Sequence, residues 1–116
     1  MKWIGVLALT LLCQSTLALD IAAYEKAKEL PDARKINEMY ITGVGQGILW
    51  ANAAVTKKTK APLYCPPESL PLNGQNYMQL IDQYLQFLRS KPGFDESAPV
   101  ELVLMRALQD NFPCKS

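Results

Sequence analysis

Three cysteines limit the folds that are open to this chain of 116 residues, because their positions decide whether a covalent cross-link can hold it. Cys13 lies in an apolar stretch at the start of the chain. Cys65 and Cys114 lie much later, each beside a proline. Whether this later pair forms a disulfide depends on the compartment, since disulfides persist in oxidising environments and are rare in the cytosol.

The first eighteen residues have the pattern of an export signal. Lys2 precedes an apolar run over residues 4–12, and small residues lead up to Ala18. This order is typical of a secretory signal peptide, and the run is shorter than the roughly 20 residues of a membrane-spanning helix. We expect residues 1–18 to be a cleaved signal peptide and residues 19–116 to form one domain outside the cytoplasm. A buried N-terminal helix is the alternative.

Cleavage after residue 18 would remove Cys13 and leave Cys65 and Cys114 as one even pair. In an oxidising compartment such a pair predicts a disulfide. The bond would close a loop of about 50 residues, which the chain-entropy model values at roughly 4 kcal/mol. A domain of this size has a total stability of about 5–15 kcal/mol. We therefore expect the disulfide to be a major source of stability; two free buried thiols are the alternative.

Apolar residues recur at helical spacing through most of the remaining chain, and no segment alternates apolar and polar residues as a strand would. Prolines and glycines separate the helical segments, and Asn73 is a plausible N-cap. The sequence predicts an all-α, compact four-helix domain with one disulfide. The helices are expected over residues 19–30, 33–53 and 74–90, and from a cap at Ser97 to Phe112.

The second expected helix contains glycines among its apolar residues. Gly43 and Gly47 lie four residues apart and share one face, where the missing side chains let another helix approach closely. A phosphate-binding glycine loop would need a preceding strand and a turn into a helix, and neither is predicted. We therefore predict close helix packing at Gly43 and Gly47. The apolar residues at helical spacing are Ile36, Tyr40, Val44, Ile48 and Ala51.

An irregular segment is expected over residues 52–72, because several prolines there forbid a regular helix. A short basic run precedes Cys65 and is interpreted as a solvated loop, the alternative being contact with an anionic partner. The prolines are Pro62, Pro66, Pro67 and Pro71, and the basic run consists of Lys57, Lys58 and Lys60.

The residue types that most enzymes use are scarce. The chain has no histidine, so Ser-His and Cys-His nucleophiles are excluded, and a zinc site is not expected. Acidic pairs such as Asp95–Glu96 are interpreted as surface charge. A formal net charge of +1 does not suit nucleic-acid binding. We expect a binding protein without cofactor, metal or catalytic residues.

Several short motifs occur in a characteristic order. Tyr40, Gly43 and Gly47 are followed by Cys65-Pro66-Pro67 and finally by Phe112-Pro113-Cys114. This order resembles the Rap/Tai family of immunity proteins, which are associated with the type VI secretion systems of Gram-negative bacteria. The resemblance covers roughly residues 36–114, and the two cysteine-proline motifs are its most specific part.

The resemblance implies an all-helical, disulfide-bonded periplasmic protein that binds a secreted peptidoglycan amidase and blocks its active-site cleft. It also implies a homodimer as a further expected assembly. Family members typically use a projecting loop, and residues 91–98 are the best candidate here. The expected partner-binding residues are Lys91, Phe94, Asp95 and Glu96. Phe94 would anchor in the cleft, the alternative being that it packs inward.

A family scaffold does not fix function. The alternative function is therefore a general periplasmic helical binding protein, or an envelope-stress protein, without a toxin partner. An adjacent amidase gene would favour immunity, whereas stress-linked expression would favour the alternative. An enzyme would show turnover that survives purification.

Overall fold

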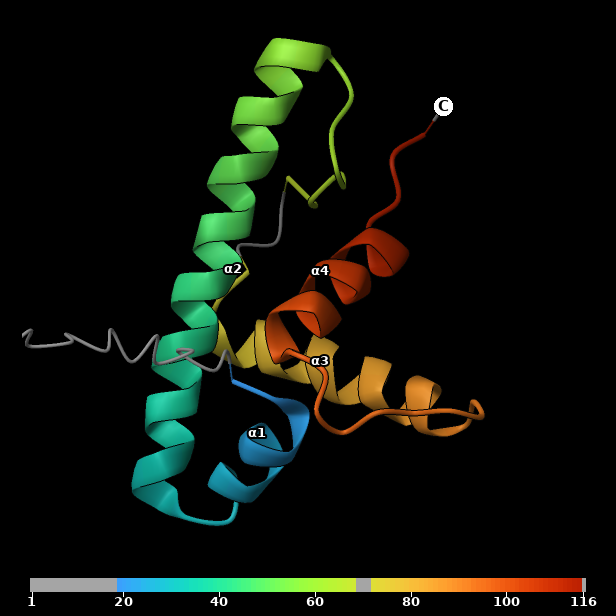
Figure 1. The fold of residues 1–116 in the computed structure, drawn as a ribbon. Helices are drawn as coiled ribbons and strands as arrows, with labels where there is room; N and C mark the ends of the chain where they lie inside the picture. Colours follow the sequence, from blue (N-terminus) through green and yellow to red (C-terminus); the bar gives the residue numbers. More distant parts are fainter. Residues whose placement is uncertain (1–18, 69–71, 116) are drawn as a thin grey trace, which may run out of the picture.

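The computed structural model describes residues 19–68 and 72–115, and the predicted signal peptide lies outside them. Four helices make up this part of the chain (Figure 1). Apart from one isolated bridge between Asp20 and Pro99, the described residues form no β-structure. The predicted all-α four-helix domain is confirmed. The helices are α1 (Ile21–Ala27), α2 (Pro31–Thr59), α3 (Gly74–Arg89) and α4 (Val100–Asn111).

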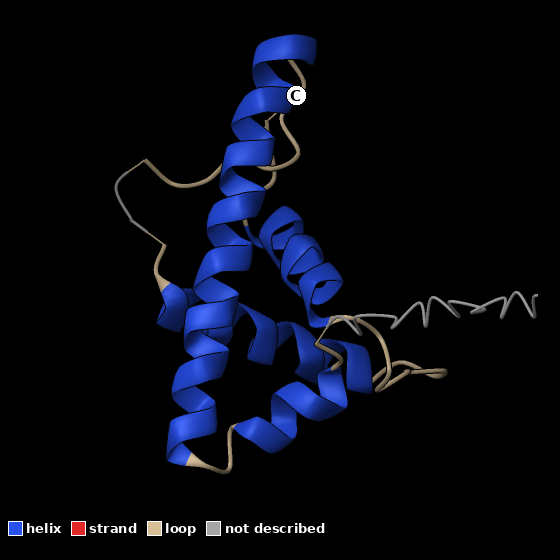
Figure 2. Cartoon of the chain, turned by 60° about the vertical axis from the view of Figure 1, so that its left-hand side comes forward, coloured by secondary structure: helices blue, strands red, loops and turns tan. Residues whose placement is uncertain are grey.

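The long helix α2 stands at one edge of the molecule, and α1, α3 and α4 all pack on the same side of it (Figures 1 and 2). The closest associations are those of α3 with α2 and of α3 with α4. One hydrophobic core lies between the helices. It consists of Ile21, Tyr24, Ile41, Tyr64, Tyr77, Met78, Leu80, Ile81, Leu85, Val100, Val103, Leu104, Ala107 and Leu108.

The apolar sides of α3 and α4 face the core. Tyr77, Ile81 and Leu85 of α3 are buried, and so are Val103 and Leu104 of α4. The apolar positions expected along α2 pack inward only in part: Val44 and Ile48 lie against the core, whereas Ile36 is 66% exposed. The buried positions of α2 are Asn37, Ile41, Gly45 and Asn52.

Close packing occurs at a different glycine from the two predicted. Gly45 faces α3, and a Cβ atom placed on it would lie 2.3 Å from Cε2 of Tyr77. Gly43 and Gly47 are exposed, and a Cβ atom on either would meet nothing within 4 Å. The prediction of close packing at Gly43 and Gly47 is therefore wrong within this chain. Only Gly45 lies on the inner face of α2, because residues two positions apart point in different directions around a helix.

The helix ends also depart in part from expectation. Asn73 caps α3 as predicted, in a reciprocal pair with Asn76. Pro99, not Ser97, occupies the N-cap of α4. Helix α2 continues through Lys57 and Lys58 to Thr59, so the first residues of the predicted irregular segment are helical. Lysines suit this helix end, because the helix dipole favours positive charge near a C-terminus.

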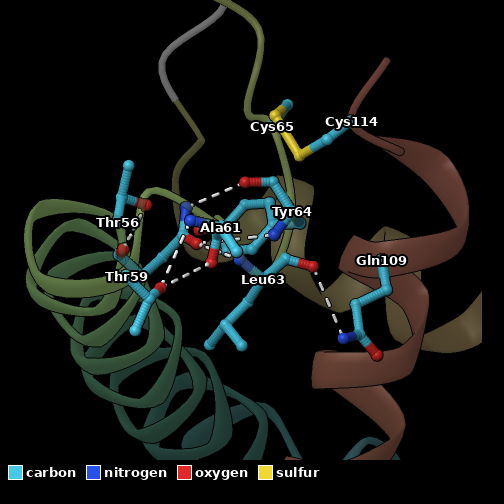
Figure 3. Close-up of a disulfide and its surroundings, with 9 residues drawn as sticks. Thr56, Thr59, Ala61, Leu63, Tyr64, Cys65, Gln109 and Cys114 are labelled. Atoms are coloured by element: carbon cyan, nitrogen blue, oxygen red, sulfur yellow. Dashed lines mark hydrogen bonds between the residues drawn. A yellow bond between two sulfur atoms is a disulfide. The ribbon is translucent and has the colours of Figure 1, made fainter. Parts of the chain in front are cut away.

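The proline-rich segment after α2 is fixed both to α2 and to the C-terminal part of the chain (Figure 3). Buried Asn52 of α2 accepts a hydrogen bond from the Leu63 N–H at 2.7 Å and donates one to the Tyr64 carbonyl at 2.9 Å. The predicted disulfide between Cys65 and Cys114 joins the segment to the chain after α4, with the two Cα atoms 5.0 Å apart. The disulfide prediction is confirmed.

Removing either cysteine is expected to destabilise the protein by a similar amount. Cys65→Ser and Cys114→Ser should each lower the free energy of unfolding by roughly 4 kcal/mol, because each opens the same loop. The double variant should lose no more than either single variant. Chemical denaturation under oxidising conditions measures this, and additive losses would contradict the role of the bond.

Adding one methyl group at the α2–α3 crossing should also destabilise the fold. We expect Gly45→Ala to cost about 1–3 kcal/mol, because the new Cβ atom overlaps the buried Tyr77 ring. Gly43→Ala is the matched control, since the same change meets open space there. Thermal denaturation of the dilute proteins compares the two, and equal stability would show that α3 does not need this close approach.

Candidate functional site

The connection between α3 and α4 projects from the helical body at the end remote from α2 (Figures 1 and 2). It contains all four residues expected to bind a partner. Lys91, Asp95 and Glu96 are exposed, whereas Phe94 is partly buried. The structure thus brings the predicted residues together in one loop, but does not leave all of them accessible.

Phe94 packs against the hydrophobic core cluster, so its ring connects the loop to the helical body. The guanidinium carbon of Arg89 lies 5.5 Å from the centre of its ring, a cation–π contact that covers part of the remaining surface. This arrangement agrees with the inward alternative for Phe94. In this conformation the Phe94 ring is only partly accessible to a partner.

Asp95 closes a tight turn at the tip of the loop. Its Oδ1 atom accepts hydrogen bonds from the Ser97 hydroxyl at 2.7 Å and from the Ser97 N–H at 2.9 Å. These two bonds stabilise the charged carboxylate and lower the pKa of Asp95. Gly93, with a φ of 79°, supplies the left-handed backbone that starts the turn. The loop therefore presents a carboxylate that is ionised at neutral pH.

A series of ion pairs runs from the loop to α1 and α3. From the loop inward, Arg89 pairs with Glu96 at 3.4 Å and with Glu25 at 3.7 Å. Lys28 then lies 3.3 Å from Glu25 and 2.9 Å from Asp82 of α3. Each pair is partly exposed, so each contributes only modestly to stability. Arg89 links this series to the loop, because it contacts both Glu96 and the Phe94 ring.

The last ion-paired residue, Asp82, contacts a buried tyrosine. The hydroxyl of Tyr24, a fully buried residue, donates a hydrogen bond to Oδ1 of Asp82 at 3.0 Å. Burial and the nearby carboxylate both raise the pKa of Tyr24, so it remains a neutral donor. Helix α1 is thereby held to the outer surface of α3.

The backbone of the loop is fixed to α1 as well. The Ala22 N–H donates to the Glu96 carbonyl at 3.1 Å, and the Ile21 N–H donates to the Ala98 carbonyl at 3.0 Å. Such bonds satisfy the free N–H groups at the start of α1 and hold the loop in one shape. A loop ordered in this way loses little conformational entropy when a partner binds.

The site exposes charged groups that are able to form ion pairs with another molecule. It offers two accessible carboxylates and one lysine on a rigid projection. Within residues 19–68 and 72–115, no group of acidic or cysteine side chains is arranged to hold a metal ion. Among the described helices, none combines the length and apolar character needed to cross a bilayer.

Sequence reasoning missed the residues that support the loop. Arg89, Glu25 and Lys28 were not among the predicted partner-binding residues. Their role depends on α1 lying beside the end of α3, which is more than 60 residues later in the chain. No local sequence pattern reports such a contact.

Replacing Arg89 should loosen the loop without unfolding the domain. We expect Arg89→Met to lower the free energy of unfolding by no more than about 1 kcal/mol, because its ion pairs are partly exposed. Hydrogen exchange should nevertheless become faster at Ala22 and Ala98, whose N–H groups bond to the loop backbone. Lys26→Met, on the exposed side of α1, is the control. Unchanged exchange would show that Arg89 does not hold the loop.

Comparison with known proteins gives one result. The family model described as Rap1a immunity proteins matches residues 7–114, which is nearly the whole chain and includes the α3–α4 loop and both bonded cysteines. Comparisons with curated proteins and with solved structures give no match. The match agrees with the resemblance carried by the cysteine-proline motifs. On this evidence the chain belongs to the Rap1a immunity protein family.

Proposed function

We propose that this protein is exported to the periplasm, where it binds and blocks a peptidoglycan amidase delivered by a type VI secretion system. Membership of the immunity family, which implies a protein effector as partner, is the observation that carries the proposal. The signal-peptide pattern of residues 1–18 and the Cys65–Cys114 disulfide both suit an oxidising compartment outside the cytoplasm.

The α3–α4 loop is the proposed inhibitory element. It projects from the body, and its shape is set before binding by Gly93, the Asp95 turn and the backbone bonds to α1. Entering a cleft with such a loop excludes substrate by occupying space, so no chemical step by the immunity protein is needed. Phe94 acts in this proposal as the inner support of the loop.

The charged side chains of the loop would recognise the amidase. Asp95 and Glu96 present carboxylates outward, and Lys91 lies near the start of the same loop. Charges at the edge of an interface mainly accelerate encounter and select the correct partner. We therefore propose that the rim of the amidase cleft carries positive charge where it meets this loop.

Capture of partners from the native periplasm and from the effectors of a neighbouring secretion cluster tests the function. The expected result is one amidase whose hydrolysis of peptidoglycan stops at a stoichiometric ratio of the two proteins. Growth inhibition by the same amidase should be relieved when the immunity protein is produced with it. A folded, disulfide-bonded protein that captures no amidase would favour the envelope-protein alternative.

The loop assignment has its own test. Asp95→Asn combined with Glu96→Gln should weaken amidase inhibition by about tenfold, which corresponds to roughly 1.4 kcal/mol of lost interaction. Each introduced amide retains an oxygen that can accept the existing hydrogen bond, from Ser97 at position 95 and from Arg89 at position 96. The double change therefore removes charge while the contacts that shape the loop can still form. Glu29→Gln removes a carboxylate just beyond the end of α1 and should inhibit normally. Full inhibition by the loop variant would place the contact elsewhere on the protein.

A further inference from the structure

The residues just before α1 lie beside the start of α4. The Val100 N–H donates a hydrogen bond to the Leu19 carbonyl at 2.8 Å, and Asp20 pairs with Pro99 in the isolated bridge. Asp20 also caps α1, because its Oδ1 atom accepts from the Ala23 N–H at 2.7 Å. The side chain of Leu19 packs against the hydrophobic core. These contacts hold Leu19 in one place at the first turn of α4.

A carboxylate in that turn has one oxygen without a partner. Glu101 directly follows Val100 in the first turn of α4. Its Oε1 atom accepts a hydrogen bond from the Tyr40 hydroxyl of α2, whereas its Oε2 atom is buried and has no hydrogen-bond partner among the described residues. Buried polar atoms in folded proteins normally have a partner. The Oε2 atom therefore marks a position where a donor would stabilise the fold.

The backbone nitrogen of Leu19 lies close to these two side chains. Leu19 and Tyr40 line the same cavity of about 280 Å³. The hydrogen bond to Glu101 and burial raise the pKa of Tyr40, and a backbone hydrogen bond from Leu19 opposes that rise. The Leu19 N–H thus points toward the hydroxyl that is bonded to Glu101.

Cleavage of the predicted signal peptide would change the chemistry of this nitrogen. Hydrolysis of the peptide bond after Ala18 adds water across it, so that Ala18 leaves with a carboxylate and Leu19 keeps a primary amine. An α-amino group has a pKa of about 7.7–8.0 and is mainly protonated at neutral pH. A single neutral N–H is therefore replaced by an ammonium group, which has three donors and a positive charge.

We propose that Glu101 and Tyr40 form a binding site for the α-ammonium group that cleavage after Ala18 creates at Leu19. The ammonium supplies the donor that the Glu101 Oε2 atom lacks, while Tyr40 remains bonded to the other oxygen. Hydrogen bonds between two charged groups are stronger than neutral ones. Removal of the signal peptide thereby completes the fold, as a local change of charge that alters the stability of the whole domain.

The inference rests on the export that the proposed function requires, and it does not depend on the identity of any effector. It explains why a carboxylate oxygen is buried beside the residue that becomes the first of the mature chain. Before export the same contact cannot form, since the Leu19 nitrogen is then part of a peptide bond.

Processing and stability of the exported protein test the proposal. The full chain is recovered from the periplasm, and mass spectrometry should show a mature protein that begins at Leu19. A second precursor carries one glycine inserted between Ala18 and Leu19, which moves the ammonium by about 3.5 Å. We expect its mature form to melt about 4–8 °C lower, because the ammonium no longer reaches the buried carboxylate.

A charge-removing variant identifies the partner of the ammonium. In Glu101→Gln the inserted glycine should lower the melting temperature by no more than about 2 °C, since the ion pair is already absent. Glu29→Gln is the matched control, because it removes an exposed carboxylate beyond the other end of α1 and should leave the full shift in place. The comparison of the two proteins that retain Glu101 needs no substitution, so it decides the matter even if Glu101→Gln does not fold.

Two results would overturn the inference. One is a mature protein that begins at a residue other than Leu19. The other is a melting temperature that the inserted glycine leaves unchanged, or lowers equally with and without Glu101. A processed protein that shows no such shift but still blocks an amidase would count against this inference alone. A protein that shows the shift but captures no amidase would count against the proposed function alone.

Discussion

The close approach of α2 to α3 is the contact on which the rest of the structure depends. The α2 backbone at Gly45 lies directly against the buried ring of Tyr77, where no Cβ atom could fit. A second close approach occurs at Gly74, whose added Cβ atom would lie 2.3 Å from Oγ1 of Thr42. With α3 fixed at these points, its opposite side can meet α4, and its far end carries the projecting loop (Figure 1).

Polar residues, as well as apolar ones, fasten other segments to the inner face of α2. Asn37 donates to the Tyr24 carbonyl at 2.9 Å and holds α1, while Asn52 holds the proline-rich segment through Leu63 and Tyr64. Both asparagines are buried, and leaving such groups unpaired would cost about 1–3 kcal/mol each. Their bonds therefore specify where α1 and the proline-rich segment lie.

The presence or absence of polar residues on the buried side of a helix explains which parts of the fold could be predicted from the sequence. In α3 and α4 the buried side is the apolar side, so residues such as Ile81 and Leu104 revealed it. In α2 the buried side mixes Ile41 with two asparagines and a glycine, so apolar periodicity did not identify it and included exposed residues such as Ile36 and Tyr40. The four candidate loop residues were located correctly as a group. The inward packing of Phe94 and the support from Arg89 depend on tertiary contacts that no local pattern encodes.

Exposed apolar side chains of α2 lie apart from the proposed inhibitory loop. Ile36 and Trp50 are 66% and 73% exposed. The α3–α4 loop instead projects from the end of α3 that is remote from α2 (Figures 1 and 2). An effector that contacts the loop would therefore leave these side chains of α2 uncovered, because the fold places the two surfaces at separate parts of the same small domain.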